Sequence, residues 1–395
     1  METYLLDWAS LLLRWAHLIA GIAWIGLSLY FIWLDDSLEP PARAEDRARG
    51  VAGELWAVYG GGFYHAQKYA LAPPALPERL HWFRWEVYWT WITGFALLVL
   101  LYYVNAETTL MDPQVMPLAK SQAIGIGLGS LILGLAVYEG LCRSPLAAND
   151  AVLAAALLVF LAALAWGLTQ VFGGRGAFIH YGAVVGTIMA GNVAHIVIPG
   201  QRELVRARRE GREPDPKHAI AAARRSVHNS YLTLPVLFAM ISGHYAMAFA
   251  SRWNWLVLVA LTVAGALIRH WFVLRHRGRP PAWPLIVAAL VLLGIAALIA
   301  PRQRGEAGPA PAMAEVERVI AAHCVSCHSA KPASARHEGA PKGVLLDTPE
   351  RIRAHAAAIH QQTVLARAMP PGNLTGMSEE ERALLDRWYR AGARP

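Results

Sequence analysis

Residues 151–171 read AVLAAALLVFLAALAWGLTQV, an uncharged and almost wholly apolar run. An α-helix needs about 20 apolar residues to cross the hydrocarbon core of a bilayer. Other stretches along the chain meet the same requirement. The eight predicted spans are 8–34, 85–104, 122–141, 151–171, 178–198, 231–250, 253–273 and 283–300. This pattern predicts an all-α protein whose residues 1–300 form an eight-helix transmembrane bundle.

Composition supports a membrane protein surrounded by lipid. The 395 residues are 55% hydrophobic and only 16% charged, which lies outside the usual balance for a soluble protein. The net charge of +8 sits in loops between apolar segments, so membrane topology explains it and nucleic acid is not an expected partner. The first apolar segment has no basic leader and no cleavage site, so we expect it to stay as an anchor.

The distribution of basic residues predicts the orientation. The first, third, fifth and seventh loops carry 18 Lys and Arg residues, whereas the loops between them carry 3. The positive-inside rule therefore places both the N-terminus and the C-terminus on the outer side of the cytoplasmic membrane, which is the periplasmic side in a bacterium.

A second decisive motif follows the last span. Cys324–Val325–Ser326–Cys327–His328 is the CxxCH pattern that attaches a c-type haem: two thiols bind the vinyl groups and the histidine binds the iron. A zinc half-site or a disulfide is the alternative, but the sequence has no second cysteine pair to complete a zinc site. Since c-haem is attached on the outer face of the bacterial membrane, the motif independently predicts the same orientation.

The region around this motif predicts a small α-helical domain of the class I cytochrome c type. Residues 301–312 are rich in Pro, Gly and Ala and form the expected linker, and 313–395 form the domain. A helix leads into the haem motif, and a last helix begins at Ser378, where Glu381 completes a capping box. Leu384, Leu385 and Trp388 give that helix an apolar face suited to covering a haem.

The second axial ligand of a c-type haem is usually Met or His. Met369 precedes two prolines and the last helix, and its loop setting suits a thioether placed on the iron. We therefore predict His328 and Met369 as the iron ligands. The alternatives to Met369 are Met377, His337, His355 and His360.

Several histidines lie within or near the predicted spans, where ionisable groups are functional candidates. His17, His180 and His244 are expected in one layer toward the outer face, and His195, His228 and His270 near the inner face. Each alone is compatible with a satisfied core residue. Together they suggest haem b between the helices, with His17, His180 and His244 as its ligand source, because an electron crossing about 30 Å of hydrocarbon needs a relay. Arg14 either pairs with a haem propionate or reaches the interface.

The first inner loop contains an unusual run at 60–69, GGGFYHAQKY. Glycines permit backbone shapes that other residues avoid. Beside aromatic rings, His65, Gln67 and Lys68, they suggest a polar pocket with a stacking surface. The alternative is an amphipathic connector that lies on the membrane surface.

The chain resembles the bacterial membrane-bound urate oxidase (urate hydroxylase) family. The resemblance covers essentially the whole chain and is carried by longer strings than the haem motif. These strings are RWAHLIAGIAWIG at 14–26, the 60–69 run, FIH at 178–180, RSVHNSYLTLP at 225–235 and RHW at 269–271. The resemblance implies an eight-helix domain fused to a cytochrome c.

The resemblance further implies that urate is oxidised to 5-hydroxyisourate, with electrons passing to the covalent haem c and then to a respiratory acceptor. The residues themselves do not identify urate. Given that substrate, we expect Lys68 to bind its charge, Gln67 its ring edge and His65 to act as general base.

Two other functions fit the sequence. One is a non-catalytic electron-transfer subunit that takes electrons from quinol or a partner dehydrogenase. The other is a haem-dependent oxidase of another substrate, such as a porphyrinogen, with His17 as a haem ligand. The polar loop at 60–69 favours the enzyme.

Overall fold

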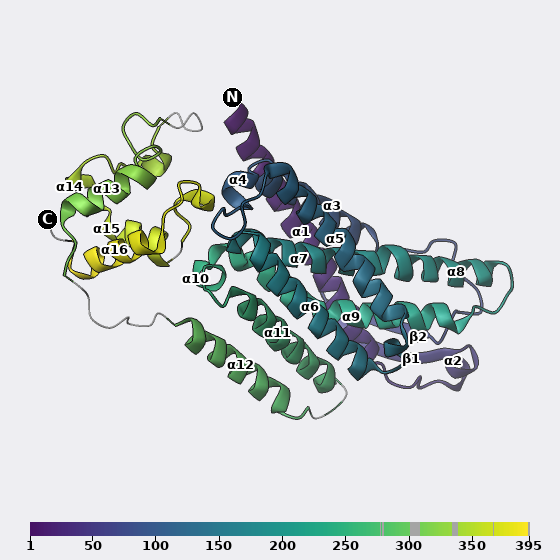
Figure 1. Ribbon diagram of the computed structural model, residues 1–395. Helices are drawn as coiled ribbons and strands as arrows, with labels where there is room; N and C mark the ends of the chain where they lie inside the picture. Colours follow the sequence, from purple (N-terminus) through teal and green to yellow (C-terminus); the bar gives the residue numbers. More distant parts are fainter. Residues whose placement is uncertain (277, 279, 301–308, 334–338, 366, 394–395) are drawn as a thin grey trace.

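The computed structural model is mostly helical and describes residues 1–276, 278, 280–300, 309–333, 339–365 and 367–393. Figure 1 shows a bundle of long helices and a group of shorter helices near the C-terminus. The bundle elements are α1 (Glu2–Asp36), α2 (Ala44–Ala48), β1 (Val51–Tyr59), β2 (Gly62–Tyr69), α3 (Trp85–Leu98), α4 (Ala106–Thr109), α5 (Lys120–Arg143), α6 (Asp150–Val171), α7 (Gly174–Asn192), α8 (Ile198–Arg209), α9 (Pro216–Ile241), α10 (Ala246–Phe249), α11 (Asn254–His276) and α12 (Trp283–Ile299). The C-terminal helices are α13 (Met313–His323), α14 (Pro349–Ala354), α15 (Ala356–Ile359) and α16 (Glu379–Arg390).

Polar side chains fix the starts of several helices. Asn149 accepts hydrogen bonds from the backbone N–H groups of Ala151 and Val152, at 2.9 and 3.2 Å, where α6 begins. Asp215 accepts from the N–H of Lys217 at 2.9 Å and begins α9 in the same way. These caps satisfy amides that have no partner inside the helix.

Six helical stretches among the described residues are long and apolar enough to cross a membrane. In one of them α7 continues through the π-helical turn Val193–Val197 into α8, which gives a single rod, Gly174–Arg209. α12 is apolar but has 17 residues, and α9 begins with a polar half. Each predicted span includes a bundle helix or part of one, and the count of eight spans stays a prediction.

The sixth predicted span, 231–250, differs most from the structure. The helix there, α9, begins at Pro216 and ends at Ile241, and it is followed by a 3-10 turn, Ser242–His244, and the short α10. The polar residues 216–230 are helical because α9 packs along α7, α8 and α11. Hydropathy cannot find a polar helix that tertiary packing stabilises.

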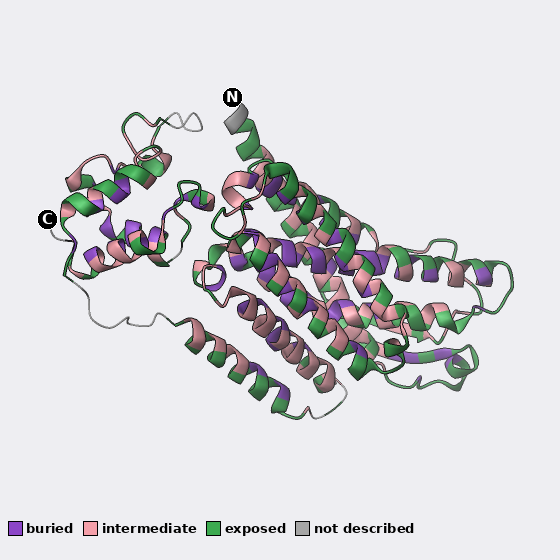
Figure 2. Cartoon of the chain, viewed as in Figure 1, coloured by how far each residue is buried: buried purple, intermediate pink, exposed green. Residues whose placement is uncertain are grey.

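Many large apolar side chains lie on the outside of the bundle, where Figure 2 shows exposed residues along the long helices, and several polar side chains lie inside it. Ile132 and Leu293 are 72% and 67% exposed, whereas His180, Asn192 and Ser230 are at most 2% exposed. A water-soluble protein buries its large apolar groups instead. The arrangement is compatible with a multi-pass membrane protein.

The prediction of an all-α protein is wrong in one place, where β1 and β2 form an antiparallel hairpin. Its turn is Gly60–Gly61, with φ values of 57° and 82°. A two-residue hairpin turn of this kind needs two positive φ values, which glycine adopts readily. The glycine run therefore makes a turn, and Tyr59 and Phe63 beside it are each 79% exposed.

The C-terminal helices pack around an apolar cluster separate from that of the bundle. Ile320 of α13 and Leu385 and Trp388 of α16 are at most 1% exposed within it. The predicted capping box is confirmed: Ser378 accepts from the N–H of Glu381, whose carboxylate accepts from the N–H of Ser378. Of the predicted linker, 301–308 lie outside the described residues.

Candidate functional site

The CxxCH motif lies on a tight turn immediately after α13. The N–H groups of Cys327 and His328 donate to the carbonyl of Cys324 at 3.1 and 2.8 Å. Cys324 is buried in the C-terminal cluster and Cys327 is half-buried. Two thiols and an imidazole are thus held on one turn of chain, against an apolar core, as covalent attachment of a single haem requires.

The environment of His328 suits an iron ligand. Its Nδ1 lies 3.0 Å from the carbonyl oxygen of Val344, which can only accept, so Nδ1 carries the proton. The lone pair is then on Nε2, and the carbonyl fixes the ring, as partners of metal-bound histidines do. Within the described part of the chain, no three His, Cys, Asp or Glu side chains converge as a zinc site would need.

Met369 and Met377 both lie on the segment that leads to α16. Met369 is half-buried, and its N–H donates to the carbonyl of Gln362 at 3.0 Å. Met377 is fully buried in the cluster that contains Cys324. Met369 remains the predicted axial ligand, with Met377 as its alternative.

The histidine alternatives to Met369 have other contacts. His360 lies 2.8 Å from Asp386 through Nε2 and stacks on Tyr389 at 4.2 Å between ring centroids. His355 bonds the carbonyl of Arg351 through Nδ1 at 2.9 Å. His337 lies outside the described residues.

His180 is fully buried near the end of the bundle that carries α4. Its Nδ1 lies 2.9 Å from the carbonyl of Gly176, and its Nε2 lies 3.1 Å from the hydroxyl of Tyr103. Nδ1 must therefore donate, and Nε2 accepts the Tyr103 proton. A Cβ on Gly127 would lie 2.7 Å from Nε2, so the pair fills this space. His180 cannot bind an iron here unless the Tyr103 bond breaks, and in this arrangement it does not fit a haem b ligand.

His17 lies against α3, well away from His180. Its Nδ1 is 3.0 Å from the carbonyl of Thr90 and 3.1 Å from the hydroxyl of Thr93. The carbonyl fixes the proton on Nδ1 and leaves Nε2 with its lone pair, so His17 suits a ligand. Tyr103, the partner of His180, lies ten residues beyond Thr93, about 15 Å along a helix axis.

The expected outer layer of three histidines is therefore not formed. His17 and His180 lie at different depths, and His244 is an exposed residue in the turn after α9. The sequence estimate assumed that a helix covers 231–250, and the early end of α9 moves His244 to the end of the bundle.

A polar network lies inside the bundle around Tyr138. Its hydroxyl is 2.8 Å from Nδ1 of His228 and accepts from Nδ2 of Asn192 at 2.8 Å. Arg225 lies over the Tyr138 ring and donates to Asn192 and, at 2.7 Å, to Glu139. The carboxylate balances the buried guanidinium.

Sequence reasoning identified only His228 in this network. Glu139 and Asn192 interrupt otherwise apolar predicted spans, and that signal singles out functional candidates. Their convergence on Arg225 joins three helices and is not visible from sequence spacing. His270 has a similar neighbour, with its Nδ1 2.8 Å from the hydroxyl of Tyr231.

The structure brings His65 and Gln67 together on β2, where both hydrogen-bond Glu54 of β1. His65 Nε2 lies 2.9 Å from Glu54 and its ring stacks on Trp56 at 4.2 Å. Lys68 instead makes an ion pair with Asp35 at 2.6 Å.

The carboxylate of Glu54 is held in its charged form. The N–H of Ala42, 2.8 Å from Oε1, is the main reason that the pKa of Glu54 lies below its usual value. Hydrogen bonds from His65 and Gln67 add to this effect and outweigh burial. A histidine that is oriented by a carboxylate can act as a base, the role predicted for His65.

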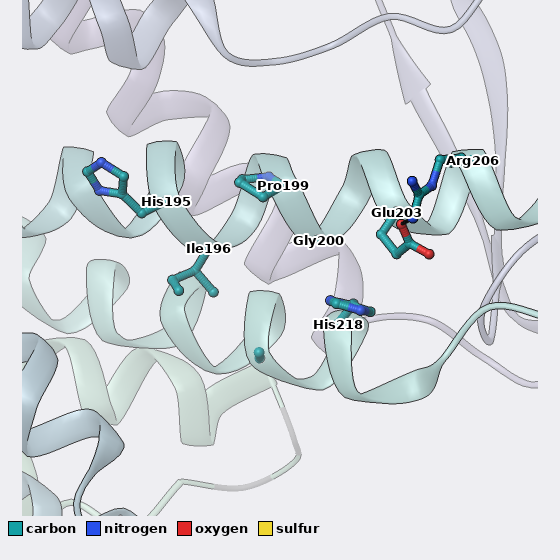
Figure 3. Close-up of a pocket in the computed structure, with 8 residues that line it drawn as sticks. His195, Ile196, Pro199, Gly200, Glu203, Arg206 and His218 are labelled. Atoms are coloured by element: carbon teal, nitrogen blue, oxygen red, sulfur yellow. Dashed lines mark ion pairs between the residues drawn. The ribbon is translucent and has the colours of Figure 1, made fainter.

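A cavity of about 590 Å³ lies between the α7–α8 rod and α9. Figure 3 shows Glu203 and Arg206 at the end near His218, with His195 farther along the rod. Glu203 and Arg206 pair at 2.5 Å. Of the histidines predicted near the inner face, this cavity contains His195, while none of the residues predicted to bind haem or urate lines it.

Comparison with known proteins assigns the bundle. A search of curated proteins and a search of solved structures each returned no match. A family profile described as "Urate oxidase N-terminal" matches residues 3–300, which covers the bundle and all of its histidine sites. Because this match spans well over half of the sequence, the chain belongs to the urate oxidase N-terminal family.

Proposed function

We propose that the chain is a membrane enzyme that oxidises urate and delivers the electrons to a covalently bound haem c. Urate and water give 5-hydroxyisourate, two protons and two electrons. One c-type haem accepts one electron at a time, so each turnover passes two electrons in succession to a respiratory acceptor. The family match over 3–300, joined in one chain to a CxxCH motif with an oriented His328, carries this proposal.

Cys324 and Cys327 would hold the haem covalently, with His328 and Met369 on the two sides of the iron. The haem supplies reversible one-electron chemistry when bound. The protein's own contribution is to orient the imidazole through Val344 and to surround the site with the buried cluster that includes Ile320 and Trp388.

The proposed orientation puts both termini on the periplasmic side of the bacterial inner membrane. The excess of basic residues in alternate loops supports it. In this orientation the β1–β2 hairpin and α8 lie on the cytoplasmic side. Protease treatment of intact spheroplasts should remove the C-terminal helices; their protection would contradict the orientation.

For urate we propose the hairpin site, with His65 as general base, Gln67 on the ring edge and Lys68 on the charge. The His65–Glu54 pair supports the base role. Trp56 is 65% exposed although it stacks on His65, so it offers an aromatic surface for a planar purine. Urate binding would draw Lys68 away from Asp35, and exposed pairs of this kind are weak, about 0–1 kcal/mol.

Two variants test this site. His65→Ala and Lys68→Ala should each slow urate-dependent reduction of the haem while leaving its reduction by dithionite unchanged. Lys217→Ala is the matched control, because Lys217 is also exposed and pairs with an aspartate, Asp215, at 2.7 Å. Wild-type rates in both hairpin variants would rule out this site.

For a haem b in the bundle, His17 is the better-suited of the predicted ligands. Its tautomer leaves Nε2 for a metal, whereas Nε2 of His180 is committed to Tyr103. Reduced-minus-oxidised spectra of haem-replete protein should then show a b-type band that His17→Ala removes. A spectrum with only a c-type band would contradict this part of the proposal.

A further inference from the structure

The loop that follows Met369 touches the bundle backbone to backbone. This loop, with the 3-10 turn Pro371–Asn373, lies beside α4 in Figure 1. A Cβ built on Gly372 would lie 2.4 Å from the carbonyl oxygen of Glu107 and 3.1 Å from that of Met111. Only a residue without a side chain allows so close an approach.

Two further interactions hold the same surfaces together. Gln114 Nε2 donates to the carbonyl of Met377 at 2.9 Å. Asp112, also on the bundle side, interacts electrostatically with Arg382 of α16 and with Arg367, which lies in the loop just before Met369. Burial raises the pKa of Asp112, and the N–H of Gln114 and these two arginines oppose that rise, as expected for a partly buried carboxylate that faces positive charge across the contact.

On the bundle side, the contact leads directly to the His180–Tyr103 pair. The carbonyl of Leu110, next to Met111, accepts the N–H of Gly173 at 3.0 Å. A Cβ on Gly176 would lie 2.9 Å from the same carbonyl oxygen, so the two segments are in close contact. The carbonyl of Gly176 in turn accepts from Nδ1 of His180.

Gly372 and Met377 of the haem domain both contact residues 107–114 of the bundle. We propose that electrons enter the haem through this contact, which we call the port. The inference rests on the proposed function, in which urate is the two-electron donor and the ferric iron is reduced one electron at a time. The contact joins the segment after Met369 to the buried imidazole of His180 and the phenol of Tyr103. The packed backbone of Leu110 and Gly176 lies between them. No bond forms or breaks at the port.

The test uses two glycine variants of the full chain. Gly372 and Gly376 lie in the same segment with φ values of 57° and 69°, so alanine causes similar backbone strain at each. A Cβ at Gly372 meets Glu107 and Met111, whereas at Gly376 it meets no atom within 4 Å. Gly372→Ala should therefore separate the surfaces, and Gly376→Ala is the matched control.

Gly372→Ala should slow urate-driven haem reduction about fivefold or more, because overpacking weakens the docking equilibrium by about that factor at least. Reduction by dithionite and the amount of attached haem should match those of Gly376→Ala. Hydrogen exchange in peptides from residues 106–116 should become faster in Gly372→Ala alone. This readout is independent of urate turnover.

Equal reduction rates or equal exchange in the two variants would overturn the port. If urate fails to reduce the wild-type haem, the proposed function is wrong, but the port is still testable. The hydrogen-exchange comparison then decides whether the two surfaces dock. Quinol replaces urate as the electron source in the reduction assay.

Discussion

With Met369 as the proposed ligand of the haem iron, replacement of Arg382 by Met should release this ligand without detaching the haem. Arg382 lies on α16, is 5% exposed, and donates to the carbonyls of Thr363 and Met369 and to Oδ1 of Asn373, the last two at 3.1 Å. It therefore fixes both ends of the Met369 loop. Methionine is similarly long but has no donors, so three acceptors lose their partner.

A buried acceptor that loses its hydrogen bond typically costs about 1–3 kcal/mol, and Arg382→Met leaves three such acceptors. That is a large share of the stability of a small domain, about 5–15 kcal/mol. Part of the cost is avoided if the loop opens to water, and the opened loop no longer holds Met369. Methionine ligation raises the reduction potential of a haem. Loss of Met369 from the iron should therefore lower that potential.

The assay is a redox titration with optical spectra in the native and the Arg382→Met protein. The covalent haem content should be unchanged, because Cys324 and Cys327 are untouched. Arg390→Met is the control: Arg390 is on the same helix but is an exposed residue, and the ion pairs of exposed side chains, such as its pair with Asp386, are worth about 0–1 kcal/mol. An unchanged potential and spectrum in Arg382→Met would refute the reasoning.

Two further predictions concern the bundle and the hairpin. Gly127→Ala should destabilise the protein by about 1–3 kcal/mol in thermal unfolding, because the new Cβ would overlap His180. Gly125→Ala is the control, because a Cβ at Gly125 meets no atom within 4 Å. Equal effects of the two substitutions would contradict the packing. The lowered pKa of Glu54 stabilises the hairpin above the ordinary carboxyl pKa of about 4.3, and this contribution should be lost as pH falls further through the lowered folded value. Proteolysis of the hairpin should therefore accelerate below that pH in the native protein, and Glu54→Gln should remove this pH dependence; an unchanged profile in the variant would contradict it.

Features set by neighbouring residues could be predicted from the sequence. The capping box of Ser378 and Glu381 depends on residues three positions apart, and the structure contains it. Apolar runs located the long helices for the same reason. The end of α16 also follows local chemistry, since Gly392 adopts a φ of 88° just beyond it.

Features set by distant contacts were missed. The glycine run at 60–62 suggested a pocket, but the pairing of β1 with β2 makes it a hairpin turn. His17 and His180 do not share a layer. The His17 ring contacts Thr90 and the His180 ring contacts Tyr103, which lies 13 residues farther along the chain. The Lys68–Asp35 pair likewise joins the hairpin to the end of α1, a relation that spacing does not reveal.

The central claim is that urate reduces the haem of this chain. The direct measurement is an anaerobic titration of the oxidised, haem-replete protein with urate, followed at the c-type band together with the urate consumed. We predict that the haem becomes reduced, with two haems reduced for each urate converted to 5-hydroxyisourate. A haem that stays oxidised with excess urate, yet is reduced by quinol, would contradict the account.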